Sequence, residues 1–231
     1  EELREQNGKA VLVAGRRQPA QVHALVAKIN GAIGAVGNTL TYVNDPEPER
    51  QLSHLDAISK LTREMTDKQV ETLIILGGNP VYDAPADLGF AAALAGVAST
   101  VHLSEHANET SMACAWHVPR AHNLETWTDA RTWDGTYTLG QPVILPLYGG
   151  VSPAELLSLV LGDEKTGDVL AADTFKALGK GNWRKAVHDG FVADTGYNTV
   201  GVALQALAPV TLAESQRAGT AAKNGALEVT F

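Results

Sequence analysis

Thr72-Leu73-Ile74-Ile75-Leu76, followed at once by Gly77-Gly78-Asn79-Pro80, decides the fold of this chain. An uninterrupted apolar run of this length, closed by glycines, is typical of a parallel strand that is covered on both faces. We therefore expect residues 72–76 to form the central strand of a parallel sheet. Such sheets bind their ligands beyond the carboxyl ends of the strands, which is where the turn at 77–80 begins.

Segments with the apolar spacing of strands and of helices alternate on both sides of this run. In chain order the patterns predict a strand at 11–13, a helix at 22–33, a strand at 39–43, a helix after Ser53 that reaches Met65, a helix at 87–94, a strand at 100–103 and a capped helix at 108–115. Parallel strands need crossover connections, and helices supply them. The alternation therefore predicts an α/β fold, a doubly wound and mostly parallel sheet with helices on both faces.

The alternation stops at Trp116, and residues 116–147 read as a long irregular segment rich in aromatic and turn residues. Segments of this kind usually bind something or pack against something. Beyond it, Ser152-Pro153-Ala154-Glu155 is a capping box that predicts a helix through Leu161, and weaker patterns predict a helix at 173–187 and a last strand at 227–231. We expect a parallel α/β domain over 1–150 and a helical extension over 151–231 packed on it.

Composition excludes several classes of function. The formal net charge of −8 argues against a nucleic-acid partner, because binding phosphates requires a concentrated basic surface. The single cysteine, Cys114, excludes an internal disulfide. The chain contains no run of about 18 apolar residues, so we expect no direct membrane insertion. The charged start leads straight into a strand pattern, which suggests a piece of a longer protein whose targeting signal could lie upstream.

Most familiar chemical motifs do not match. Gly15-Arg16-Arg17-Gln18-Pro19 lacks the glycine spacing of a dinucleotide site, although its arginines could hold an anion, and Gly179-Lys180-Gly181-Asn182 is not a phosphate-binding P-loop. One stretch holds a group of possible metal ligands, namely His102, His106, Cys114, His117 and His122 with Glu105, Glu109 and Glu125. Their spacing fits no standard metal motif, so we expect no metal site. Gly77-Gly78-Asn79 can offer backbone amides to a phosphate or nucleotide, or can be a plain tight turn.

The same turn resembles a known family. Leu76-Gly77-Gly78-Asn79-Pro80 with the segment 85–94 resembles the strand, turn and helix of molybdopterin oxidoreductases, whose Gly-x-Asn-Pro turn lies along the guanine-nucleotide end of the cofactor. Further matching positions are Glu109-Thr110, His117-Val118-Pro119, Glu125 and Asp134-Gly135-Thr136. Two segments depart from the family pattern, at 115–119 and 137–141. The sequence at residues 79–87, 114–117 and 146–150 most resembles that of the large iron–sulfur subunit of alternative complex III, a quinol-oxidising respiratory complex.

The resemblance extends over about 9–162 and is specific over 72–150. The family uses molybdopterin guanine dinucleotide and iron–sulfur clusters, but in this branch the corresponding region is thought to hold no molybdenum, and its clusters lie in a separate cysteine-rich region. A [4Fe–4S] cluster takes four thiolates, and this chain has one cysteine. The resemblance thus implies a non-catalytic, cofactor-free structural domain, peripheral on the periplasmic face of a bacterial inner membrane, that contacts other domains of its subunit and other subunits.

Two alternatives remain open at this point. The chain can keep a relic nucleotide or anion site formed by Gly77, Gly78, Asn79 and Asp83. It can also be a fragment of a molybdopterin-dependent oxidoreductase whose active site needs chain that is missing here. Neither alternative assigns a catalytic residue or a metal ligand within these 231 residues.

Overall fold

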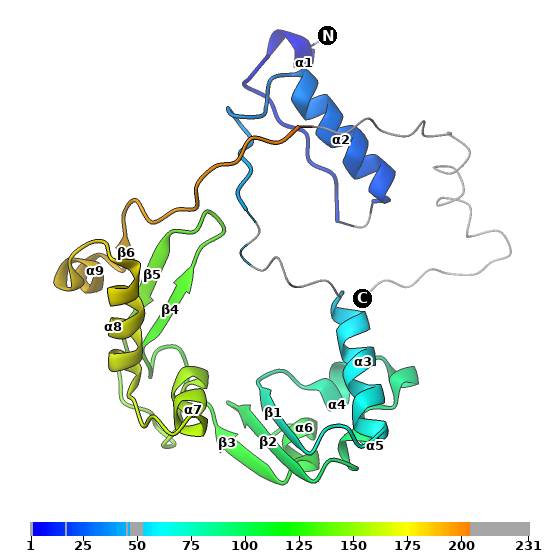
Figure 1. The fold of residues 1–231 in the computed structure, drawn as a ribbon, viewed down its shortest axis with the longest axis vertical. Coiled ribbons are helices and arrows are strands. Elements are labelled where there is room, and N and C mark those ends of the chain that lie inside the picture. Colours follow the sequence, from blue (N-terminus) through cyan, green and yellow to red (C-terminus); the bar gives the residue numbers. More distant parts are fainter. Residues whose placement is uncertain (1, 17, 45, 47–52, 204–231) are drawn as a thin grey trace, which may run out of the picture. The chain divides into compact units, whose positions relative to one another are not determined.

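The structure is a computed structural model and describes residues 2–16, 18–44, 46 and 53–203 (Figure 1). The chain divides into two compact units, one formed by residues 1–45 with 198–231 and the other by residues 46–197. The predicted strand at 227–231 lies outside the described residues. Of the helices that the structure describes, none is both long and apolar enough to cross a membrane.

The first unit contains the helices α1 (Glu2–Glu5) and α2 (Ala20–Ala32), and α2 confirms the helix predicted at 22–33. The strands predicted at 11–13 and 39–43 are wrong: residues 11–13 have no strand pairing, and residues 39–43 form only isolated bridges at Leu40 and Val43. A side chain replaces the missing strand partner. Asn30 on α2 accepts from the Leu12 amide at 2.8 Å and donates to the Leu12 carbonyl at 2.9 Å.

The second unit begins with a three-stranded parallel sheet of β1 (Thr72–Leu76), β2 (Ser99–Ser104) and β3 (Trp116–Pro119), in that order. This confirms the two predicted strands and a coarse α/β fold. The central place predicted for residues 72–76 is wrong, because β2 lies between the other two described strands. Burial agrees with this order, since Leu103 on β2 is fully buried whereas Leu76 at the end of β1 is 40% exposed.

Helices α3 (His54–Thr66) and α5 (Phe90–Leu94) cover one face of β1 (Figure 1). Their apolar side chains form a core with alternate residues of the strand: Met65, Phe90, Ala93 and Leu94 pack with Leu73 and Ile75. Ser53 caps α3 as predicted, since its hydroxyl accepts from the Asp56 amide at 3.1 Å. The helix predicted at 87–94 is split, because Gly89 adopts a φ of +66° between a 3₁₀ turn at Ala86–Leu88 and α5.

Two short helices stand at the carboxyl end of the sheet, α4 (Pro80–Asp83) directly after β1 and α6 (Glu109–Ala113) after β2. The predicted capped helix at 108–115 is confirmed in shorter form. The Asn108 side chain caps α6 by accepting from the Ser111 amide at 3.1 Å. Both helices therefore begin close to strand ends, where they can position residues of a site.

The segment predicted to be irregular contains β3 and two further strands, β4 (Thr128–Arg131) and β5 (Tyr137–Gly140). Strands β4 and β5 form an antiparallel sheet with β6 (Phe191–Val192), in the order β4-β5-β6. The prediction is wrong here because polar strands such as Thr-Asp-Ala-Arg carry no apolar alternation. A tight turn at Gly135, with a φ of +87°, joins β4 to β5.

Three helices complete the unit: α7 (Pro153–Val160), α8 (Gly167–Leu178) and α9 (Trp183–Asp189). The predicted capping box at Ser152 and Glu155 is confirmed. The helix predicted at 173–187 is divided between α8 and α9, because Gly179 ends α8 with a φ of +64°. A second core lies between α8, α9 and the antiparallel sheet, formed by Tyr137, Leu139, Ala171, Ala186 and Val192.

Candidate functional site

The turn after β1 has a backbone that requires glycine. Gly77 has a φ of +88° and Gly78 a φ of +75°, both in the left-handed region that side chains disfavour. Pro80 is then the first residue of α4, where its missing amide costs no hydrogen bond. The sequence thus directs the chain sharply out of the sheet at the carboxyl end of β1, the position predicted for a ligand site.

The side chain of Asn79 fixes this turn to α6. Its Oδ1 accepts from the Thr110 amide at 3.1 Å and from the Thr110 hydroxyl at 2.7 Å, while its Nδ2 donates to Glu109 Oε2 at 2.6 Å. The Asn79 bond lowers the pKa of Glu109. Thr110 is fully buried and its Oγ1 also accepts from the Val81 amide at 3.0 Å. Both the oxygen and the nitrogen of the Asn79 side-chain amide are therefore hydrogen-bonded within the protein.

A buried histidine supports the same turn from β2. His102 is fully buried, and its Nε2 lies 3.1 Å from the Gly78 carbonyl while its Nδ1 lies 2.8 Å from the Ser111 hydroxyl. A carbonyl only accepts, so Nε2 carries the proton and Nδ1 accepts from Ser111. Burial, with a smaller contribution from the nearby His117, lowers the pKa of His102. The lowered pKa favours the neutral ring, and the Gly78 carbonyl favours the tautomer with its proton on Nε2.

The four residues predicted for a nucleotide or anion site come together. Gly77, Gly78, Asn79 and Asp83 line a single cavity of about 530 Å³ at the carboxyl end of β1. The opposite wall comes from the first turns of α3 and includes His54, Leu55 and Ile58. The hollow is open to solvent, and its lining combines an apolar wall with a few polar groups.

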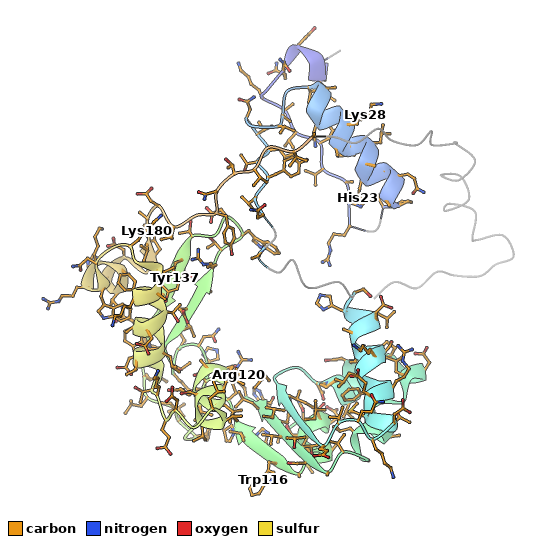
Figure 2. All side chains as sticks on the ribbon, viewed as in Figure 1. His23, Lys28, Trp116, Arg120, Tyr137 and Lys180 are labelled. Carbon is orange, nitrogen blue, oxygen red and sulfur yellow. The ribbon has the colours of Figure 1, made fainter. Side chains whose placement is uncertain are left out.

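Sequence reasoning missed Arg120, which follows β3 directly (Figure 2). Its guanidinium reaches to β1, because Nη1 lies 3.1 Å from the place that a Cβ on Gly77 would occupy. Its Nε is buried and has no hydrogen-bond partner. The signal that could have found it is the parallel register, since β1, β2 and β3 end at one edge of the sheet. His54 was also missed, because α3 lies far from the turn in sequence.

The possible metal ligands do not converge. Within the described ranges, no group of three or more His, Cys, Asp or Glu side chains is placed to hold one ion. His102 is used by Gly78 and Ser111, and the His122 ring accepts from the Leu124 amide at 3.2 Å. Cys114 packs against the core of the parallel sheet, and burial raises the pKa of its thiol.

An exposed apolar segment lies outside this site. Residues 142–148, which we name the strap, contain Val143, Ile144, Leu145, Leu147 and Tyr148, all exposed, with Leu145 at 86% and Tyr148 at 84%. The strap is tethered by the turn at 122–125. The Leu124 carbonyl accepts from the amides of residues 143 and 144, and Glu125 Oε1 accepts from the Leu147 amide at 3.3 Å.

Comparison with protein-family models finds no match for this chain, and comparison with curated proteins finds none either.

Proposed function

We propose that this chain is a non-catalytic, cofactor-free structural domain of a respiratory, quinol-oxidising complex, similar to part of the large iron–sulfur subunit of alternative complex III. Its task is to hold neighbouring domains and subunits in place. The resemblance over 72–150 supports the setting. The strap supports the task, and it is the observation on which the proposal depends.

The composition and exposure of the strap suit a protein interface. From residue 135 to residue 154 the sequence has no charged side chain, and interface cores are depleted in charge and enriched in aromatic residues. The exposed apolar surface of the strap is on the order of 600 Å², close to the roughly 800 Å² that a standard interface buries on each partner. The tethers at Leu124 and Glu125 hold the strap in one form, which lowers the entropy cost of docking.

Site-specific photo-crosslinking in the assembled complex tests the proposal. We expect benzoylphenylalanine in place of Leu145 to crosslink to a defined apolar surface of another domain or subunit of that complex. The same probe in place of Leu161, which is 84% exposed at the end of α7, is the control and should crosslink at least tenfold less. Equal, scattered crosslinking from both positions would contradict a docking role.

Elemental analysis tests the cofactor-free part separately. Purified chain should contain molybdenum and iron only at trace levels. A stoichiometric amount of either metal, bound by side chains of this chain, would contradict the proposal whatever the strap does.

We also propose the finer fold, a doubly wound sheet with helices on both faces. Side chains alternate between the faces of a strand, so Leu103 on β2 points away from the face of His102. Leu103 is fully buried, and its neighbours on that face, Val101 and Val118, are partly buried. A second covering layer on the face opposite α3 and α5 accounts for this burial. Hydrogen exchange should then show β2 protected as strongly as the core of α3.

The second candidate function is a relic nucleotide site, favoured by the cavity that gathers Gly77, Gly78, Asn79 and Asp83. Guanine nucleotides at 100 times their dissociation constant would add about 2.7 kcal/mol to the free energy of unfolding. A thermal-shift series with GMP, GDP and GTP measures this, with Asp83→Asn as the variant expected to weaken the effect. An unchanged melting temperature with all three nucleotides would argue strongly against this candidate.

A further inference from the structure

We propose that the outer face of the β4-β5-β6 sheet, with the tip of its β4–β5 hairpin, docks against an apolar helix of the same neighbouring domain or subunit that covers the strap. This inference rests on the proposed function for the existence of an assembled complex. It adds a second contact surface and names the kind of partner that fits it. We name this surface the hairpin face, and it consists of Thr128, Ala130, Thr138, Gly140, Phe191 and Trp133.

The two faces of this sheet differ in charge. The inner face packs on α8 and α9, where Tyr137, Leu139 and Val192 are buried (Figure 1). Both charged residues of β4 belong to this inner side, because Asp129 lies opposite Leu139 and Arg131 lies opposite Tyr137. The Tyr137 hydroxyl accordingly donates to Asp129 Oδ2 at 3.0 Å. The strand positions that alternate with these residues form the outer face, and they carry no charged side chain.

The outer face is built from small side chains around one aromatic ring. Thr138 lies opposite both Ala130 and Phe191, and Gly140 lies opposite Thr128, so the five residues form one patch. Ala130 is exposed and Phe191 is 47% exposed. The Thr138 hydroxyl donates to the Ala130 carbonyl at 3.2 Å, so its polar group is already hydrogen-bonded. Because small side chains let a second layer approach the strands closely, the patch fits the aliphatic side chains of a helix.

Trp133 stands fully exposed at the tip of the hairpin. Other groups fix the turn around it: the Thr132 amide donates to the Thr136 carbonyl at 3.0 Å, and Arg131 Nη1 donates to the Gly135 carbonyl at 2.7 Å. The indole therefore adds no burial to the fold of this unit. Tryptophan is among the residue types most enriched in binding hot spots, and a rigid turn presents it at a low entropy cost.

The hairpin face continues into the strap. Strand β5 ends at Gly140 and the strap begins at residue 142, and the four residues of β5 span about 13 Å, well within the roughly 30 Å width of a standard interface. The strap alone exposes on the order of 600 Å², less than the roughly 800 Å² of a standard interface. Trp133 adds about 250 Å² and the half-exposed Phe191 about 100 Å². One partner that covers both surfaces therefore reaches the area of a stable interface.

Photo-crosslinking from the hairpin tip in the assembled complex tests this inference. We expect benzoylphenylalanine in place of Trp133 to crosslink to an apolar helix of the partner that residue 145 reaches. The control position is Lys185 on α9, which lies on the inner side of the sheet with its side chain 74% exposed, and it should crosslink at least tenfold less. Crosslinks to lipid, to this chain itself, to a surface other than a helix, or equally from both positions would overturn the inference.

Variants at Trp133 measure what the indole contributes to assembly. When each variant is co-expressed with the unmodified chain, Trp133→Ala should enter the complex at least tenfold less often, and Trp133→Phe should lie between the two. The matched control is Tyr82→Ala, which removes a 73% exposed aromatic side chain from α4 and should enter as often as the unmodified chain. Equal incorporation of Trp133→Ala would contradict the inference.

Two further readouts separate the possible failures. Because Trp133 is fully exposed, its replacement should leave the melting temperature of the isolated chain within about 2 °C, so that lost incorporation reports docking and not misfolding. A defined crosslink from residue 145 without one from residue 133 would remove this inference alone. Scattered crosslinking from residue 145 would instead count against the proposed function.

Discussion

Replacement of Thr110 by valine removes the hydroxyl that joins α6 to the turn after β1 while keeping the shape of the side chain. In the structure this hydroxyl donates to Asn79 Oδ1 at 2.7 Å and accepts from the Val81 amide at 3.0 Å. Thr110 is fully buried, so water cannot readily replace either bond. Thr110→Ser is the matched control, because it keeps the hydroxyl and loses only one methyl group.

The expected magnitudes differ enough to be resolved. Leaving the Val81 amide without an acceptor costs about 1 to 3 kcal/mol, and the lost bond to Asn79 adds about 1 kcal/mol, giving about 2 to 4 kcal/mol for Thr110→Val. Loss of one buried methyl group in Thr110→Ser costs about 0.8 kcal/mol. For a unit of this size, 1 kcal/mol lowers the melting temperature by roughly 2 to 4 °C.

Urea unfolding followed by tryptophan fluorescence, with the denaturant slope checked for constancy, measures both variants. Thr110→Val should be the less stable of the two by at least 1 kcal/mol. A valine variant as stable as the serine variant would refute the reasoning, because it would mean that the hydroxyl bonds carry no net stability. A double-mutant cycle with Asn79→Ala should show coupling, since the two residues share a bond.

Further predictions concern the buried sheet and the strap. Folding lowers the pKa of His102 from 6.5, so as the pH falls the unfolded chain binds this proton before the folded chain does. The free energy of unfolding should therefore decrease as the pH drops below 6.5. Urea midpoints measured at several pH values should show this decrease, and the decrease should be smaller in His102→Asn. Leu103→Ala should cost about 2 to 5 kcal/mol in calorimetric unfolding, whereas Leu145→Ala on the exposed strap should stay within about 0.5 kcal/mol. Glu125→Ala should speed hydrogen exchange at the Leu147 amide, which Glu125 Oε1 accepts from, and lower the crosslinking yield from residue 145; unchanged exchange would contradict the tether.

Local signals predicted the elements whose stability is local. The apolar run at 72–76 predicted β1 to the residue, and the capping box at Ser152 predicted α7, because in each case the decisive interactions lie within a few residues. The strand predicted at 11–13 failed because its backbone partner is a side chain, Asn30, eighteen residues away. The order of the strands also failed, since apolar runs report burial and do not report which strand lies between two others.

The site was predicted in part for the same reason. Glycine followed by Asn-Pro marks a turn, and a turn after a parallel strand lies at a ligand edge, so Gly77, Gly78 and Asn79 could be chosen from sequence alone. Arg120 could not, because its reach to Gly77 depends on β2 separating β1 from β3. The role of His102 was equally hidden, since its bond to the Gly78 carbonyl spans twenty-four residues.

The hydrogen-bonding capacity of the residues around the turn argues for an architectural role. Asn79 and Thr110 hydrogen-bond to each other, and the Thr110 hydroxyl also accepts from a neighbouring backbone amide. Both ring nitrogens of His102 hydrogen-bond, one to Gly78 and the other to Ser111. Groups bound in this way hold a turn in place and have little capacity left for a reacting molecule. The strap, which we propose as the docking surface, lies outside this hydrogen-bonded network and is exposed.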